Sequence, residues 1–82
     1  MMNVEELQDE LHKRKVPETV YGIGCEQDES HCIVEESGLW HVFYSERGCR
    51  TFEEIFSHEP EACREFLSRI LGDETIIAWM AR

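Results

Sequence analysis

Four cysteines and four histidines in a chain of 82 residues raise the question of zinc binding or thiol catalysis. The sequence contains neither CxxC nor HxxxH, and it lacks the paired ligand spacing of a structural zinc site. Cys32 and Cys63 fall at apolar positions of an expected strand and an expected helix, where a free thiol behaves as a small hydrophobic group. We therefore predict reduced, structural cysteines, no metal site and no cofactor.

The other groupings that could support catalysis are weak. Cys25 and His31 could form a nucleophile pair, but their acidic surroundings would disfavour the thiolate that such a pair needs. Glu35-Glu36 and Glu53-Glu54 lie on expected strands, so the two carboxylates of each pair point to opposite faces and cannot share a proton. The sequence has no phosphate-binding loop, dinucleotide fingerprint or nucleophile elbow. We predict that the protein is not an enzyme.

Acidic residues dominate the composition. The 18 Asp and Glu residues outnumber the eight Lys and Arg residues, which gives a formal net charge of −10. This charge would repel a phosphate backbone, so we expect no nucleic-acid partner. The start MMNVEELQDE lacks the basic region of a secretory signal, and no apolar stretch approaches membrane-spanning length. We expect a cytoplasmic protein with no membrane partner.

The negative charge is concentrated in the segment between Lys15 and Arg47, which contains no Lys or Arg. Two interpretations of this segment remain open. It can be a solvated surface that keeps the protein soluble, or it can attract a basic partner electrostatically. The acidic residues of the segment are Glu18, Glu26, Asp28, Glu29, Glu35, Glu36 and Glu46.

Capping residues and apolar periodicity predict two helices. The first runs from residue 4 to about residue 15, with Asn3 as its cap and Pro17 preventing its continuation. The second follows Ser57 as its cap and ends at Gly72. The apolar stripe of this second helix consists of Ala62, Cys63, Phe66, Leu67 and Ile70.

Three closely spaced strands are predicted between the helices. They cover residues 31–37, 37–46 and 49–56, with turn-forming pairs at Ser37-Gly38 and Arg47-Gly48. Strands joined by such short turns form an antiparallel meander. The element order is therefore α-β-β-β-α.

This order predicts one α+β domain over residues 1–82. It has two layers, in which the antiparallel meander packs against the N-terminal and C-terminal helices. The run TVYGIG at residues 19–24 is β-prone and adds a short edge strand. The tail at residues 73–82 is apolar, but it is too short for its structure to be decided from periodicity.

The middle strand, with the sequence SGLWHVFYSE, is apolar on both faces. Trp40, Val42 and Tyr44 point to one side, whereas Leu39 and Phe43 point to the other. Helices cover only one face of the sheet, so the second face is either buried by the tail or used for binding. We predict that Leu39 and Phe43 pack against the helices. Trp40 and Tyr44 carry polar groups and suit the open, partly hydrated face.

The segments VPETVYGIG, CIVEESGLWHVFYSERG and FSHEPEACREFLSRIL resemble the small α+β immunity proteins of bacterial polymorphic toxin systems. The likeness covers most of residues 3–71, and the YSERG hairpin and the EACREFL helix carry it. The resemblance implies a protein that binds and blocks a toxin made by the same cell, without catalysis. Many toxin domains of these systems are nucleases with basic grooves. The tail after Gly72 departs from the family pattern.

Two functional hypotheses follow. In the first, the chain is a cytosolic immunity protein whose acidic and aromatic residues bind a toxin domain with a basic surface. In the second, it is a structural or regulatory subunit that forms a homodimer through its open sheet face and its tail, and its acids serve solubility. A metal-dependent enzyme is the third alternative, supported only by the abundance of Cys and His. For the first hypothesis, the candidate partner-binding residues are Glu26, Asp28, Glu29, Glu35, Glu36, Trp40, Tyr44, Glu46 and Arg47.

Overall fold

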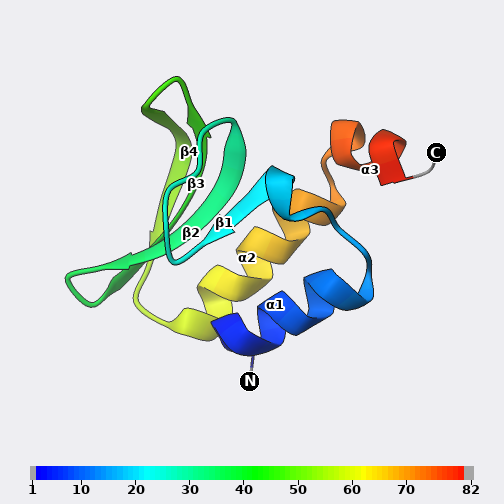
Figure 1. The fold of residues 1–82 in the computed structure, drawn as a ribbon. Coiled ribbons are helices and arrows are strands. Elements are labelled where there is room, and N and C mark those ends of the chain that lie inside the picture. The colour runs from blue at the N-terminus through cyan, green and yellow to red at the C-terminus, as the bar shows by residue number, and fades with distance from the viewer. Residues whose placement is uncertain (1, 81–82) are drawn as a thin grey trace.

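The computed structural model describes residues 2–80, and these residues form an α+β fold with a four-stranded sheet (Figure 1). The order of the main elements is the predicted one, extended by a short strand before the meander and a short helix after it. The elements are α1 (Val4–Lys13), the 3-10 helix η1 (Glu18–Val20), β1 (Tyr21–Ile23), β2 (Ser30–Glu36), β3 (Leu39–Glu46), β4 (Cys49–Phe56), α2 (Glu59–Leu71) and α3 (Glu74–Met80).

Helix α1 begins at the predicted residue because Asn3 caps it. The side-chain oxygen of Asn3 accepts a hydrogen bond from the backbone N–H of Glu6 at 2.9 Å. Leu7 and Leu11 lie on the inner face of the helix and are fully buried. The helix ends at Lys13, slightly earlier than predicted.

Helix α2 forms at the predicted place, but the predicted cap is wrong. His58, not Ser57, occupies the cap position, with an extended backbone and no side-chain hydrogen bond to the helix. Pro60 explains this start, because proline fits the first turn of a helix, where no N–H is required. Glu59 joins the two helices, since its carboxylate accepts a hydrogen bond from the backbone N–H of Val4 at 2.8 Å.

The sheet has the strand order β1-β2-β3-β4, and β2, β3 and β4 form the predicted antiparallel meander. The turns between them lie at Ser37-Gly38 and Arg47-Gly48, as predicted. All four turn residues have positive φ, between 51° and 80°. This is the type I′ geometry, whose twist matches that of the flanking strands.

Strand β1 is the edge strand that the sequence predicts, but it pairs parallel to β2, with Tyr21 opposite His31. Parallel strands normally need a long crossover connection. Here residues 24–29 alone make the return, by passing closely over β1. A Cβ atom on Gly22 would lie 2.7 Å from the carbonyl oxygen of Cys25, so the close approach requires glycine at this position.

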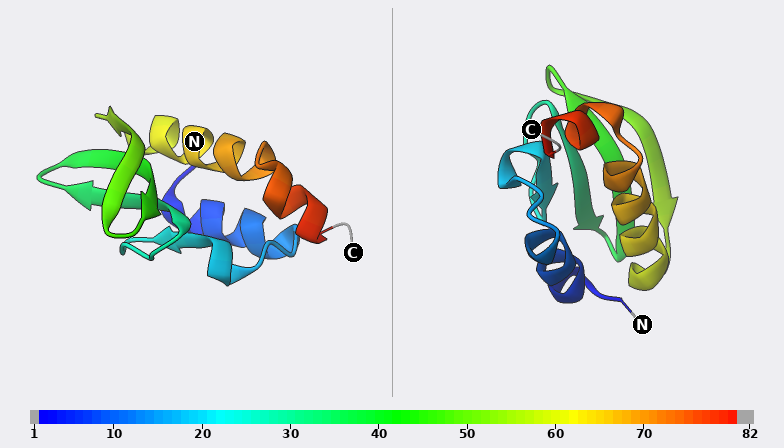
Figure 2. Two further views of the ribbon diagram at one scale, coloured as in Figure 1. Left: turned by 90° about the horizontal axis from the view of Figure 1, so that it is seen from above. Right: turned by 90° about the vertical axis from the view of Figure 1, so that its right-hand side faces the viewer.

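Helices α1 and α2 cover one face of the sheet, and the main hydrophobic core lies between these two layers (Figure 2). The burial of the predicted α2 stripe is confirmed for Phe66 and Ile70, which have no exposed surface. The buried residues of this core are Leu7, Leu11, Val16, Tyr21, Ile33, Val42, Ala62, Cys63, Phe66, Ile70 and Ile76.

The prediction of which side of β3 faces the helices is wrong. Val42 is fully buried in the core beneath the helices, and Trp40 packs against the same core. Phe43 belongs to a separate buried cluster on the opposite face, and Leu39 is 40% exposed. Alternation alone could not decide, because both faces of β3 are apolar. The pairing of Val42 with Ile33 of β2 supplies the apolar surface on which α2 packs.

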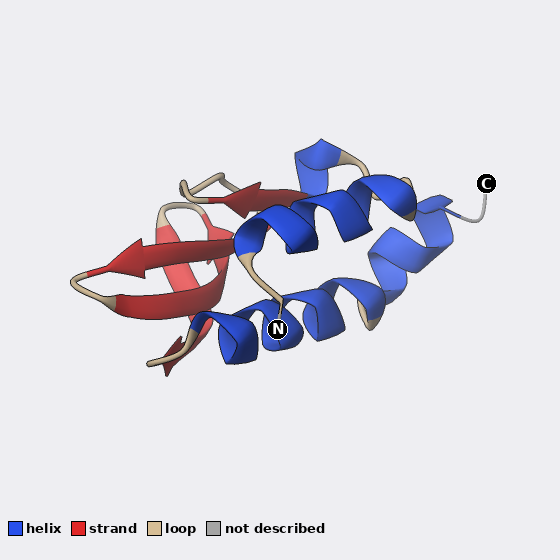
Figure 3. Cartoon of the chain, turned by 90° about the horizontal axis from the view of Figure 1, so that it is seen from below, coloured by secondary structure: helices blue, strands red, loops and turns tan. Residues whose placement is uncertain are grey.

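The tail forms helix α3, which lies at the end of the molecule away from the strands (Figure 3). Ile76 joins the main core, whereas Ile77 and Trp79 are each about half exposed. The prediction for residues 81 and 82 falls outside the described residues. Within residues 2–80, no helix is both long enough and apolar enough to cross a membrane.

Candidate partner-binding groove

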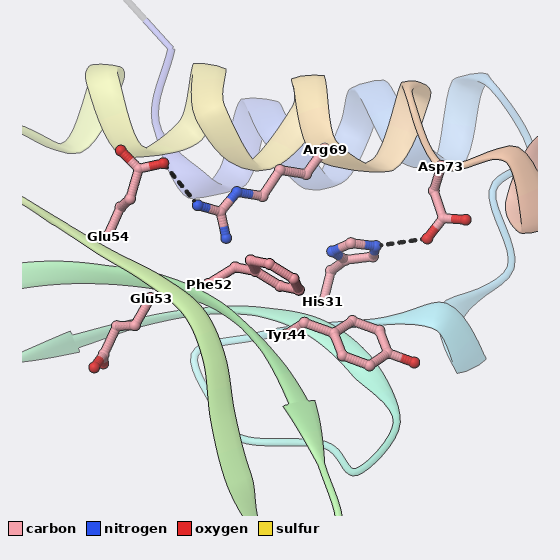
Figure 4. Close-up of a pocket in the computed structure, with 7 residues that line it drawn as sticks. All are labelled: His31, Tyr44, Phe52, Glu53, Glu54, Arg69 and Asp73. Carbon is pink, nitrogen blue, oxygen red and sulfur yellow. Dashed lines mark hydrogen bonds and ion pairs between the residues drawn. The ribbon is translucent and has the colours of Figure 1, made fainter.

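A groove of about 580 Å³ lies between the ends of strands β2 to β4 and the junction of α2 with α3. A second hollow, of about 510 Å³, shares four of its lining residues and continues to Arg69 of α2 (Figure 4). We call the combined site the Tyr44 groove. Its defining residues are Glu29, His31, Tyr44, Glu46, Phe52 and Asp73.

His31 and Asp73 join the sheet to the helical layer at the base of the groove. The His31 Nε2 atom lies 2.9 Å from Asp73 Oδ2 (Figure 4). Burial raises the pKa of the Asp73 carboxyl, but hydrogen bonds from His31 and from the backbone N–H groups of Thr75 and Ile76 lower the pKa by more, so the net shift is downward. An ionised Asp73 only accepts hydrogen bonds, so Nε2 must be the donor in this pair.

His31 also positions Tyr44. The two rings meet edge to face, with a centroid separation of 5.1 Å. The His31 side chain is only 12% exposed, and its Nδ1 atom is buried without a hydrogen-bond partner among the described residues. The orientation of Tyr44 is therefore set by a histidine that Asp73 holds in place.

Phe52 is an exposed aromatic residue in a strained conformation. Its φ angle is +56°, in the left-handed region that a bulky residue rarely adopts. The strain coincides with an irregularity in the pairing of β3 with β4, between Val42 and Tyr44. The ring is 82% exposed and borders the Tyr44 groove. A strained backbone that holds an apolar ring at the surface indicates a functional position.

Four carboxylates act electrostatically on the Tyr44 hydroxyl. Burial raises the pKa of Tyr44, and the negative charges of Glu29, Glu46, Asp73 and Asp28 raise it further. These acids come from the loop before β2, from the end of β3 and from the α2–α3 junction. The rim of the groove is therefore strongly negative.

The register of β2 with β3 also brings like charges together. Ser30 at the start of β2 pairs with Ser45, which precedes Glu46, and Glu29 lies in the turn before β2 with a φ angle of +53°. Both glutamates line the groove, so their like charges repel each other. Neither glutamate forms a salt bridge with a described residue. A cation bound at this place would relieve the repulsion.

The opposite face of the sheet carries a second charged cluster, centred on Arg50. The guanidinium lies 4.3 Å from the centroid of the Phe43 ring. It forms salt bridges of 2.8 to 2.9 Å with Glu26, Glu36 and Glu53. The arginine that pairs with Glu36 is therefore Arg50 and not Arg47 at the hairpin tip.

The nine candidate partner-binding residues thus fall into three groups. Glu29, Tyr44 and Glu46 line the groove, and Asp28 lies beside them. Glu26 and Glu36 pair with Arg50 on the other face. The remaining three lie apart from both sites: Glu35 exposed near the end of β2, Trp40 against the core and Arg47 at the exposed tip of the second hairpin.

Sequence reasoning missed His31, Phe52 and Asp73 as parts of one site. The available signals were a histidine on an apolar strand, a phenylalanine in a strand otherwise rich in charge and an aspartate next to Gly72. None of these signals implies proximity, because the three residues come together only through the strand register and the position of α3. Arg50 was missed for the same reason.

Cys32 and Cys63 are free and fully buried, as the sequence predicts. Burial raises the pKa of the Cys63 thiol to about 11 and also raises the pKa of Cys32. Cys25 and Cys49 are free and exposed. Within the part of the chain that the structure describes, no group of three or more His, Cys, Asp or Glu side chains could hold a metal ion.

Comparison with known proteins adds no relative to this picture. No protein-family model, curated protein or solved structure matches the chain. The groove, the surface charges and the fold are therefore the observations from which a function can be inferred.

The Arg50 cluster gives a first prediction. We expect Arg50→Ala to lower the free energy of unfolding at pH 7 by about 1–3 kcal/mol, a value reduced by solvent screening of the exposed partners. The substitution leaves Glu26, Glu36 and Glu53 without their shared cation. Urea unfolding followed by circular dichroism measures the loss. Arg47→Ala removes the same charge at the hairpin tip and should cost less than about 0.5 kcal/mol.

The pH dependence separates this cluster from simple loss of packing. The hydrogen bonds from Arg50 lower the pKa values of Glu36 and Glu53. The stability that they contribute is therefore present above the unfolded glutamate pKa of about 4.3 and is lost as pH falls through the lower folded values. The difference in stability between the wild type and Arg50→Ala should therefore shrink as pH falls from about 5 to about 2, through the unfolded and then the lower folded pKa values. A difference that stays constant over this range would contradict the assignment.

Proposed function

We propose that the protein is a non-catalytic binding protein that acts in the bacterial cytoplasm as an immunity protein and neutralises a toxin domain by direct contact. The observation that carries the proposal is the Tyr44 groove, in which two aromatic rings lie beside Glu29 and Glu46, two glutamates that form no salt bridge with a described residue. A toxin domain with a basic surface has the complementary charge.

The ion pairs distinguish the acids of the groove from the glutamates that contact the described arginines. Arg14, Arg50 and Arg69 together engage glutamates on α1, in the loop before β2, on β2, on β4 and on α2. Asp28, Glu29 and Glu46, in contrast, are exposed and make no salt bridge within residues 2–80. Their charge is available to attract a partner and to bind it.

The aromatic residues supply the second part of a protein-binding site. Tyrosine is among the residues that contribute most to binding energy, because its ring buries apolar area while its hydroxyl keeps a hydrogen bond. Tyr44 is partly buried and held by His31, so little side-chain freedom is lost when a partner binds it. Phe52 adds an exposed ring beside it. Acids that accelerate encounter and rings that slow dissociation are a suitable combination for an inhibitor.

The groove chemistry favours binding over catalysis. Its His31–Asp73 pair resembles part of a catalytic triad, but no cysteine lines either hollow among the described residues. The hydroxyl of Thr51 donates a hydrogen bond to the carbonyl oxygen of Tyr44 at 3.0 Å. This threonine is therefore engaged in joining β3 to β4.

Helix α3 supports a second candidate, a subunit that associates with itself. Ile77 is 50% exposed and Trp79 is 52% exposed, so α3 presents an apolar surface. Sedimentation equilibrium of the protein alone separates the two candidates. The immunity hypothesis expects a monomer until the toxin is added, whereas the subunit hypothesis expects a dimer without it.

The proposal predicts that a toxin domain is encoded next to this gene, and that domain provides the test. We expect the purified protein to abolish the activity of that domain at a molar ratio of about one to one, as expected for direct blocking of a single site. Size-exclusion chromatography should show a complex of the two chains. Full toxin activity at a large excess of the protein, with no complex formed, would refute the immunity function.

A further inference from the structure

We propose that the Tyr44 groove binds an arginine side chain of the partner, with the guanidinium placed against the Tyr44 and Phe52 rings and between the surrounding carboxylates. The inference rests on the proposed function, because it takes the partner to be a protein. It specifies the chemical group that the groove recognises.

The protein contains an internal example of this arrangement. On the opposite face of the sheet, the Arg50 guanidinium lies over the Phe43 ring and pairs with three glutamates. The Tyr44 groove has the corresponding parts, aromatic rings and several carboxylates, but its lining arginine, Arg69, pairs with Glu54 and Glu65 and leaves Glu29 and Glu46 without a cation among residues 2–80. The same sheet therefore presents one filled and one unfilled site for a guanidinium.

The arginine that lines the groove already has ion-pair partners within the chain. Arg69 lines the second hollow, but its guanidinium bonds to Glu65 at 2.7 Å and to Glu54 at 2.9 Å. Figure 4 shows its side chain directed to Glu54, whereas Asp73 receives His31. Glu29 and Glu46 are left for an external cation.

The unpaired charged groups of the groove, Glu29 and Glu46, only accept hydrogen bonds. His31 adds no free N–H donor in its neutral form, because its Nε2–H is donated to Asp73 and its Nδ1 atom is buried. A guanidinium carries five N–H donors in one plane and no acceptor. The groove is thus lined by acceptors and by ring faces, and it suits a flat cation.

Arginine fits these features better than lysine. The guanidinium stacks on aromatic rings, pairs with carboxylates through two parallel hydrogen bonds and is more weakly hydrated than an ammonium group. The open shape and the volume of about 580 Å³ leave room for a side chain that enters from solvent. A neutral side chain of the same shape would leave the repulsion between Glu29 and Glu46 in place.

The test uses small probes and does not require the toxin. We expect N-acetyl-arginine methylamide to cause saturable changes in the amide NMR signals of residues around Tyr44, Glu46 and Phe52. The neutral citrulline analogue should bind at least about tenfold more weakly, and the lysine analogue should lie between them. Equal shifts with the arginine and citrulline probes would overturn the inference.

Variants assign the binding to the groove. Glu29→Gln and Phe52→Ala each alter an exposed side chain, so both should fold, and each should weaken binding of the arginine probe by about threefold or more. Glu35→Gln removes the same charge from an exposed position outside the groove and should bind like the wild type. Unchanged binding by Glu29→Gln and Phe52→Ala would place the probe elsewhere and overturn the inference.

The two proposals can fail separately. If the protein binds the arginine probe but does not bind the neighbouring toxin domain, the proposal of an arginine site stands and the proposal of an immunity function fails. If the wild type, Glu29→Gln and Phe52→Ala all neutralise the toxin domain equally well, the immunity function stands. The arginine site is then contradicted.

Discussion

Phe66→Ala is expected to lower the free energy of unfolding by about 3–5 kcal/mol, the range for truncation of a large core side chain. Phe66 has no exposed surface, and its ring meets that of Tyr21 edge to face at a centroid separation of 6.4 Å. It lies where α2 packs on the sheet, so its loss opens a cavity in the core to which α1, β1, β2, β3, α2 and α3 all contribute residues. A domain of this size has little stability to spare.

Denaturant unfolding followed by circular dichroism measures this effect. Phe52→Ala is the matched control, because it removes the same ring from a position that is 82% exposed, and it should change stability by less than about 1 kcal/mol. A loss below about 1 kcal/mol for Phe66→Ala would mean that α2 does not pack on the sheet as described.

Local sequence signals predicted most of the fold. Asn3 marks the start of α1, the Ser37-Gly38 and Arg47-Gly48 pairs form the turns of the meander, and Gly72 follows α2. Each of these signals acts through residues that are close in sequence, so no tertiary information is needed to read it. The parallel pairing of β1 is different, since nothing in the run TVYGIG specifies strand direction.

The side of β3 that packs against the helices could not be predicted, because both of its sides bury apolar residues. Val42 lies under the helices, and Phe43 lies under the Arg50 guanidinium on the other side. The sequence predicts that the second face of the sheet is half open. In the structure, Arg50 and the loop at residues 24–29 cover part of this face. Hydrogen bonds from Arg50 to Glu26 and from the backbone N–H of Gln27 to Cys32 hold this cover in place. A charged side chain took the covering role that the sequence suggested for the tail.

Only part of the candidate site could be predicted, because the rest depends on contacts between residues far apart in sequence. Glu29, Tyr44 and Glu46 belong to the acidic, aromatic segment that the composition itself indicates. His31 and Asp73 are 42 positions apart in sequence, and only the packing of the α2–α3 junction against β2 brings them together. Long-range contacts of this kind leave no pattern in a single sequence.

Reversal of the groove charges is the second prediction with a large expected effect. Changing Asp28, Glu29 and Glu46 to Lys should slow association with the toxin domain by about tenfold or more at low salt, because it turns an attractive field at the binding site into a repulsive one. The fold should survive, since these side chains are exposed and form no salt bridge with a described residue. Circular dichroism verifies that it does.

A matched variant separates the local field from net charge. Changing Glu5, Asp9 and Glu61 to Lys alters the net charge by the same amount on exposed positions of α1 and of the first turn of α2. This variant should associate at a rate between those of the wild type and the groove variant. It keeps the field at the Tyr44 groove while it lowers the overall negative charge.

The central claim is that the charge around the Tyr44 groove captures a basic partner, and stopped-flow association kinetics with the neighbouring toxin domain tests it most directly. The account predicts that wild-type association slows as salt rises toward physiological strength, where screening limits exposed charges to about 8 Å. It also predicts that the groove variant loses or inverts this dependence, whereas the α1 and α2 variant keeps it. Equal rates and equal salt dependence for the wild type and a folded groove variant would contradict the claim.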